Sequence, residues 1–202
     1  MSAQHLSGIE NTRTPDYEIH PLFLERWSPR AFSQEDVAEE VWLSILEAAR
    51  WAPSSSNLQP WRFLIARTPE DRAKFHAFIA PSNREWCDQA PLLVLLLSYT
   101  LSPNGQPSGS HAMDTGTAWG YMALEATNQG LITHAMAGFN QQQARVDLHI
   151  PDDYAIHAVI AVGYQGDKAT LSEKFQEREL PSSRRPITES LYEGDFGQAF
   201  HR

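Results

Sequence analysis

The chain has 202 residues, with 16 Lys and Arg against 25 Asp and Glu, which gives a formal net charge of −9 at pH 7. Hydrophobic residues make up 42% and charged residues 20%, proportions typical of a folded globular protein rather than a disordered one. The negative charge argues against binding to a nucleic-acid backbone, because such binding depends on clustered Lys and Arg. We therefore expect no nucleic-acid partner.

The cysteine and histidine content limits the cross-links and metal sites that the chain can form. Cys87 is the only cysteine, so it is predicted to be a small buried side chain rather than part of a disulfide or a multi-cysteine zinc site. The eight histidines are scattered and no two have the i, i+4 spacing of a helical metal site, so we expect no metal ion.

The sequence shows no signal for export or membrane insertion. Residues 1–16 lack the charged and apolar regions of a signal peptide, and the longest apolar run, 90–97, is shorter than the roughly 20 residues that span a bilayer. These observations predict a cytoplasmic protein without membrane contact. Residues 1–15 are polar and aperiodic and are predicted to form a flexible arm, and residues 16–202 a single domain with a C-terminal extension.

The clearest helical pattern runs from about 35 to 51. Ser33 and Asp36 have the spacing of a capping box at its start, and Pro53 stops it. The apolar residues recur at three- and four-residue steps: Val37, Val41, Trp42, Ile45, Leu46 and Ala49. This spacing predicts an amphipathic helix. From Pro21 onward helical and extended patterns alternate, which favours an α/β or α+β fold.

Three short segments rich in aliphatic or aromatic residues are predicted to be buried strands: 61–66, 91–97 and 155–163. A second helix is predicted over 70–79. No G-x-G-x-x-G motif follows any of the strands, so the sequence gives no support for a Rossmann dinucleotide site.

A long helix of few charges is predicted over 111–129, after a polar surface loop at 102–110. It contains Gly116 and Gly120. Because each glycine costs a helix about 1 kcal/mol relative to alanine, two of them predict a close approach to another backbone, within the core or across a subunit interface. Residues 171–202 lack a core pattern, and we expect this extension to pack on a partner subunit.

The first segment that can carry chemistry is Arg26-Trp27-Ser28-Pro29-Arg30, which precedes the first predicted helix. Two guanidinium groups on either side of a hydroxyl form a possible clamp for a phosphate or a carboxylate, since arginine offers planar paired donors. The alternative interpretation is that these are ordinary surface arginines near a helix start.

The second segment is the polar loop between that helix and the first strand, with the sequence A-P-S-S-S-N-L-Q-P-W at 52–61. Proline at both ends stiffens it, and its hydroxyl and amide groups can line a pocket for a planar heterocycle. The alternative is a hydrogen-bonded connector without a ligand.

Taken together, R-x-S-x-R, an amphipathic helix and A-P-S-S-x-N-x-Q-P-W followed by an apolar strand resemble the nitroreductase family of flavin-dependent oxidoreductases. Asn83-x-x-Trp86-x-x-x-Ala90-Pro91 is similar to the segment before that family's next core strand. The helix from Asp114 to Leu131 with the later Ala137-Gly138-Phe139, and the basic cluster Arg184-Arg185-Pro186, extend the resemblance over about 21–193.

The resemblance implies an α+β fold with a central, mainly antiparallel sheet wrapped by helices, assembled as a homodimer with two FMN sites at the subunit interface. It implies an oxidoreductase that transfers hydride from NADH or NADPH through bound FMN to a small-molecule electron acceptor, such as a nitroaromatic or a quinone, in a ping-pong cycle. The alternatives are a relative with another flavin reaction (dehalogenation, enone reduction or azoline oxidation) and a non-catalytic flavin-binding protein.

For the cofactor phosphate and ribityl chain, the resemblance implies contacts from Arg26, Ser28, Arg30 and Arg184, with backbone contacts from Trp27. A lysine frequent in that family's C-terminal basic cluster is absent here, and Ser182 stands in its place. The clamp is therefore expected to differ in detail. No side chain is assigned as catalytic, because the flavin N5 carries the chemistry.

For the flavin ring, the resemblance implies contacts from three other places in the chain. Asn83 is expected to hydrogen-bond the pyrimidine edge, and the N–H groups of Ala137 and Gly138 to face flavin N5 and O4. Four residues of the polar loop are expected to approach the flavin from the other subunit: Pro53, Ser54, Ser55 and Asn57.

Overall fold

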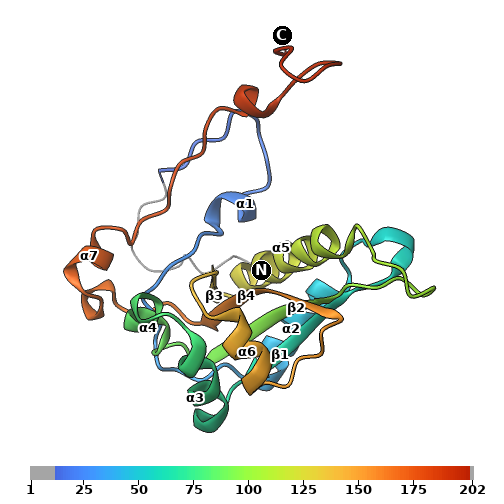
Figure 1. Ribbon diagram of the computed structural model, residues 1–202. Helices are drawn as coiled ribbons and strands as arrows, with labels where there is room; N and C mark the ends of the chain where they lie inside the picture. The colour runs from blue at the N-terminus through green and yellow to red at the C-terminus, as the bar shows by residue number, and fades with distance from the viewer. Residues whose placement is uncertain (1–11, 201–202) are drawn as a thin grey trace.

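The computed structural model describes residues 12–200 (Figure 1). The helices are α1 (Leu22–Glu25), α2 (Glu39–Arg50), α3 (Pro69–Phe78), α4 (Pro81–Cys87), α5 (His111–Asn128), α6 (Gln141–Asp147) and α7 (Glu173–Gln176). The strands are β1 (Trp61–Ala66), β2 (Leu92–Tyr99), β3 (Ile132–Met136) and β4 (Tyr154–Gly163). Three 3₁₀ turns complete these elements: η1 (Ser55–Asn57), η2 (Lys168–Thr170) and η3 (Ile187–Ser190).

The strands form one sheet in the order β1-β2-β4-β3, and every neighbouring pair is antiparallel. The register shifts between Leu96 and Leu97, where a bulge in the pairing with β4 changes the partner residue. The predicted α+β fold with an antiparallel central sheet is confirmed.

Both faces of the sheet are covered by helices (Figure 1). Alternate residues of β2 point to opposite faces, so Leu93 and Leu95 enter one core and Val94 and Leu96 the other. The first core contains buried side chains from α3, α4 and α6, and the second contains Ile45, Ala49, Ala118 and Met122 from α2 and α5. Because β2 is buried on both faces, its first six residues, 92–97, are continuously apolar rather than alternating.

The predicted start of α2 is wrong. The helix begins at Glu39 rather than near residue 35, its N-cap residue Ala38 makes no side-chain cap, and the predicted capping box does not form. The residues before it are held extended by the chain that follows β4: Ser33 N–H donates to the Tyr164 carbonyl (2.9 Å) and Gly166 N–H to the Ala31 carbonyl (2.7 Å). The chain leaves this pairing without entering a helix: residues 35–38, which carry the local helical signal, are irregular, and Ala38 has an extended ψ of 146°.

Strand β3, Ile132–Met136, was not among the predicted strands. Its five residues include Thr133 and His134 and show no regular alternation, so the sequence carries little strand signal there. The prediction for β1 has the observed bounds, and those for the second helix and for α5 are shifted by one residue at one or both ends.

The N-terminal and C-terminal segments run side by side away from the body of the fold (Figure 1). Two hydrogen bonds join them: Arg13 Nε–H donates to the Ser182 carbonyl (2.9 Å), and Ile187 N–H donates to Asp16 Oδ2 (2.7 Å). They carry several exposed large apolar side chains: Tyr17, Ile19, Phe23, Leu180, Ile187, Tyr192, Phe196 and Phe200. Residues 1–11 of the predicted flexible arm lie outside the described residues.

Cys87 is fully buried, and burial raises its pKa to about 12, which fits the predicted role of a small apolar side chain. Within residues 12–200, no helix has the combination of length and apolar character needed to cross a membrane.

Candidate functional site

A cavity of about 400 Å³ lies where the N-terminal and C-terminal segments reach the sheet. We call it the arginine cavity, because five of its ten lining residues are arginines. The lining residues are Arg13, Arg26, Trp27, Ser28, Arg30, His134, Arg178, Leu180, Ser182 and Arg184. No carboxylate is among them, so the lining is strongly cationic in a chain that is acidic overall.

The Arg26–Arg30 segment forms one wall of the cavity and is fixed from the sheet. His134 of β3 lies with Nδ1 2.9 Å from the Pro29 carbonyl oxygen, and its ring packs 4.5 Å from that of Trp86. Burial lowers the pKa of His134 to about 4, so the ring is neutral near pH 7 and Nδ1 carries the proton that it donates to Pro29. Arg26 Nη1 lies 3.4 Å from Ser28 Oγ, within the same wall.

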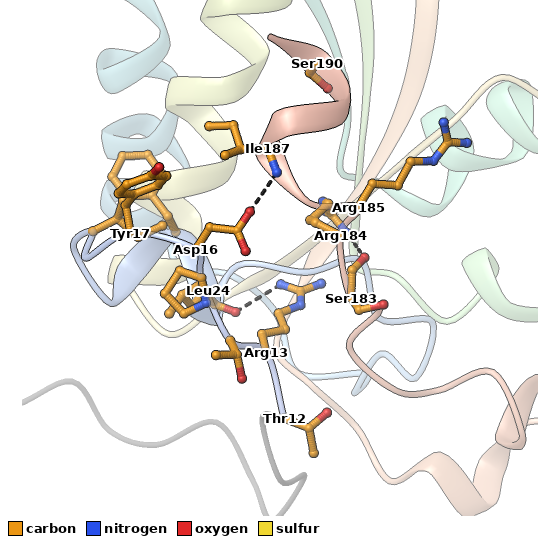
Figure 2. A pocket seen from close by; sticks show the side chains of 14 residues that line it. Thr12, Arg13, Asp16, Tyr17, Leu24, Ser183, Arg184, Arg185, Ile187 and Ser190 are labelled. Atoms are coloured by element: carbon orange, nitrogen blue, oxygen red, sulfur yellow. Dashed lines mark hydrogen bonds between the residues drawn. The ribbon is translucent and has the colours of Figure 1, made fainter. Parts of the chain in front are cut away.

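Arg13 joins this wall to the C-terminal wall. Its Nη1 donates to the carbonyls of Leu24 (3.0 Å) and Arg26 (2.7 Å), while its Nε donates to the Ser182 carbonyl. One guanidinium group therefore fixes the distance between Arg26 and the segment that carries Arg184. Arg13 also lines a second cavity, of about 570 Å³, that lies between the two terminal segments and is shown in Figure 2.

The electrostatics of the arginine cavity favour an anionic ligand. The pKa values of Arg13 and Arg26 are lowered by burial and then by the charge of Arg184. Burial also lowers the pKa of Arg30, against the opposing effect of Glu179, and Arg178 adds to the lowering. Cations that destabilise one another in this way are stabilised by a multiply charged anion placed among them. The residues present thus fit the phosphate of FMN.

The polar loop at 53–57 lies at another place in the fold. Its 3₁₀ turn η1 contains left-handed backbone at Ser56 (φ 47°) and Asn57 (φ 56°). Asp114, buried in the first turn of α5, accepts hydrogen bonds from Ser55 N–H and Ser110 Oγ–H, both at 3.1 Å. The long helix therefore fixes the loop through one carboxylate.

Asn83 and Gly138 are brought together by the loop between β3 and α6. Asn83 Nδ2 donates to the Gly138 carbonyl, as does Ala80 N–H, both at 3.0 Å. A Cβ at position 138 would lie 2.6 Å from Asn83 Nδ2, so a side chain there would displace the Asn83 amide from its hydrogen bond. Ala137 precedes this glycine, three residues after His134, on the chain that leaves the arginine cavity.

The structure therefore arranges the predicted site residues in three groups. Arg26, Trp27, Ser28, Arg30 and Arg184 line the arginine cavity. Asn83 forms a second group with Ala137 and Gly138, and the four residues of the polar loop form a third beside α5; none of these line that cavity within one chain.

Several residues of the site were not predicted from the sequence. Arg13 lies in the arm that was predicted to be flexible, and Arg178 lies in the extension without a core pattern. His134 belongs to the missed strand β3. Asp114 was the one with a usable signal, since an acidic residue in the first turn of a nearly uncharged helix suggests a capping or anchoring role.

Similarity to known proteins indicates one family. Residues 24–85 and 76–164 match the sequence model of the nitroreductase family. A Thermus thermophilus protein named NADH dehydrogenase is 28% identical over an alignment that covers 84% of this chain and 95% of that protein. Iodotyrosine deiodinase 1 of Mus musculus is 24% identical, with 84% of this chain and 72% of that protein covered.

A solved structure gives a closer match. The crystal structure of a protein described as an oxidoreductase containing FMN is 38% identical to this chain, with a TM-score of 0.89, and the alignment covers 95% of this chain and 99% of the other.

Proposed function

We propose that this chain, which belongs to the nitroreductase family, is an FMN-dependent oxidoreductase that passes electrons from NADH or NADPH to a small oxidised acceptor such as a nitroaromatic or a quinone. The observation that carries the proposal is the arginine cavity, which has five guanidinium groups and no carboxylate in its lining. The solved relative described as containing FMN, at 38% identity, supports the choice of cofactor.

The phosphate of FMN would be held by the side chains of Arg26, Arg30 and Arg184, with Ser28 adding a hydroxyl donor. Neutral His134 would support this grip indirectly, because its hydrogen bond fixes the Pro29 carbonyl between the first two of these residues. Paired N–H donors on planar guanidinium groups are well suited to phosphate oxygens.

The flavin ring would extend toward Gly138, whose lack of a side chain leaves its backbone open to a close approach. Backbone N–H groups of Ala137 and Gly138 would then donate to the ring, and donors at such positions favour charge that develops on it. When bound, FMN supplies the acceptance and release of hydride, so the protein has to bind, orient and tune it.

We further propose that two chains are needed to complete each site. The polar loop at 53–57 does not line the arginine cavity of its own chain, although both match the family pattern. An exposed stripe on α5 offers the contact surface: Met113 is 73% and Tyr121 42% exposed, and a Cβ added at Gly116 or Gly120 would meet no atom within 4 Å. Glycines that are not required within one chain suit close packing against a second one.

The direct test is the visible spectrum of the freshly purified protein, followed by oxidation of NADH and NADPH with nitrofurazone or menadione as acceptor. We expect the absorption bands of oxidised flavin, close to one FMN per chain, and turnover with one of the donors. A colourless protein that does not bind added FMN would contradict the proposal.

The second candidate is reductive dehalogenation, which the similarity to iodotyrosine deiodinase 1 favours. Release of iodide from 3-iodotyrosine under reducing conditions, without turnover of nitrofurazone or menadione, would support it. Tight FMN binding without any turnover would instead indicate a flavin-binding protein.

A further inference from the structure

Glu179 is a buried carboxylate at the edge of the arginine cavity. It stands between Arg178 and Leu180, both of which line the cavity, but Glu179 itself does not. Its side chain is 0% exposed and therefore points from the C-terminal wall into the body of the protein. A buried glutamate is costly unless it is paired or hydrogen-bonded, so its contacts indicate its role.

One carboxylate oxygen joins the two walls of the cavity. Glu179 Oε1 accepts hydrogen bonds from the backbone N–H groups of Arg30 (2.7 Å) and Ala31 (2.8 Å). Arg30 belongs to the wall that begins at Arg26, 149 residues earlier in the chain than Glu179. Because Glu179 uses both N–H groups, Arg30 can donate hydrogen bonds to a ligand only through its side chain.

The other oxygen faces the guanidinium group of that same arginine. Glu179 Oε2 is buried and has no hydrogen-bond partner among residues 12–200, and Arg30 Nη1 lies 4.0 Å away. The guanidinium carbon of Arg30 also lies 5.6 Å from the ring centroid of Phe175, in α7. Arg30 is thus confined by a charge and a ring that both belong to the C-terminal segment.

We propose that Glu179 is the positioning residue of the arginine cavity: its carboxylate fixes Arg30 against the Arg178–Arg184 segment, so that guanidinium groups from both walls meet a single phosphate. The inference rests on the proposed function, since the phosphate is that of FMN. Glu179 acts through Arg30 and does not itself touch the cofactor.

A carboxylate near an anion site also has an opposing effect, because its charge reduces the positive potential that attracts phosphate. The two effects predict opposite results when Glu179 is removed. If it positions the clamp, FMN binds more weakly without it; if it only contributes negative charge, FMN binds more tightly.

The test is flavin binding to the full-length apoprotein, measured by fluorescence with FMN and with riboflavin, which lacks the phosphate. We expect Glu179→Ala to weaken FMN binding by roughly tenfold or more, as for the loss of a charge-assisted contact. Riboflavin binding should change less than about twofold, because the ring contacts lie elsewhere. Glu177→Ala, an exposed change of equal charge two residues away, should leave both affinities unchanged.

Glu179→Gln keeps the size and one acceptor oxygen and serves if the alanine variant does not fold; it should show a smaller loss in the same direction. FMN affinity that is unchanged or higher in these variants would overturn the inference. Equal losses for FMN and riboflavin would also overturn it, because they would indicate a merely structural role. A wild-type protein that binds no FMN would instead refute the proposed function, and the inference with it.

Discussion

At the scale of single residues, the structure distinguishes Arg26 from an ordinary surface arginine. Its side chain lines the arginine cavity and its backbone carbonyl accepts a hydrogen bond from Arg13, so it lies where both terminal segments meet. From the sequence alone, the alternative interpretation was that Arg26 is an ordinary surface arginine. Burial and the neighbouring Arg184 lower its pKa, which an isolated surface arginine would not show.

Arg26→Ala should weaken FMN binding by about 1.5–3 kcal/mol, or roughly tenfold to 150-fold, through loss of a charge-assisted phosphate contact. Fluorescence titration of the apoprotein measures the change. Arg67→Ala is the matched control, since it removes an exposed guanidinium that pairs with Glu39 far from the cavity. Equal affinity in the two variants would argue against the assigned clamp.

His134 makes the stability of the fold dependent on pH. The folded protein binds a proton on its ring only near pH 4, whereas an unfolded chain binds it near the ordinary value of 6.5. Between these values the unfolded state holds more protons, so the stabilising effect of the neutral ring is complete above pH 6.5 and is lost as the pH falls toward 4.

A shift of this size corresponds to at most about 3.5 kcal/mol of unfolding free energy. We expect urea unfolding of the apoprotein to show a weaker dependence on pH in His134→Gln than in wild type between pH 6.5 and 4.5. The pKa values of His76 and His157 are also lowered by burial, but they affect both proteins alike. Identical pH dependence in the two proteins would show that His134 is not buried as a neutral ring.

At the scale of elements, the sequence predicted the helices and strands whose apolar residues pack directly into the core. Strand β1 and helix α5 were found within one residue, because the apolar residues of β1 pack into both cores and those of α5 into the second core. The start of helix α2 was placed four residues too early, and β3 was missed. Strand β3 takes its form from pairing with β4, and the chain before α2 is paired at residues 31–33 with the segment that follows β4.

The same distinction applies to the candidate site. Arg26 and the polar loop at 53–57 have local motifs, so a single sequence was enough to single them out. Arg13, Arg178 and Glu179 lie in segments without periodicity, and their roles depend on contacts across more than 100 residues of chain. No local pattern encodes such contacts.

Asp114 links two elements, and its loss should affect the polar loop more than the core. Asp114→Ala leaves Ser55 N–H and Ser110 Oγ–H without their acceptor, so we expect a loss of about 1–3 kcal/mol in unfolding free energy, measured in urea. FMN retention should fall as well. Asp36→Ala, at an exposed position, is the control and should leave both quantities unchanged.

The exposed stripe of α5 gives a second prediction at this scale. In one chain a Cβ added at position 120 would meet no atom within 4 Å, so a side chain can begin there without a clash, and leucine favours a helix over glycine. Gly120→Leu should therefore fold normally and yet shift the protein toward monomer in light scattering after size exclusion. Asn128→Leu, an exposed change at the end of the same helix, should remain dimeric. A dimeric Gly120→Leu protein would exclude close helix packing at this position.

At the scale of the whole molecule, the terminal segments are hard to explain in a monomer. They project from the body of the fold as a pair (Figure 1), and side chains as large as Phe23 and Phe196 are 55% and 91% exposed on them. Apolar side chains gathered on a projecting segment gain stability when they are buried against another surface. A second copy of the chain, contacted by these segments and by α5, would provide that burial.

If each flavin is held by the arginine cavity of one chain and the polar loop of its partner, two defective chains can restore a site. Arg26→Ala and Asn57→Ala homodimers each carry two damaged sites. A mixed dimer carries one intact site and one with both defects. Unfolding the two variants together and refolding them at equal ratio should therefore restore tight FMN binding to roughly a quarter of all sites, from random pairing. Each variant refolded alone is the control. If both residues served a flavin within one chain, every site would keep one defect and mixing would restore nothing.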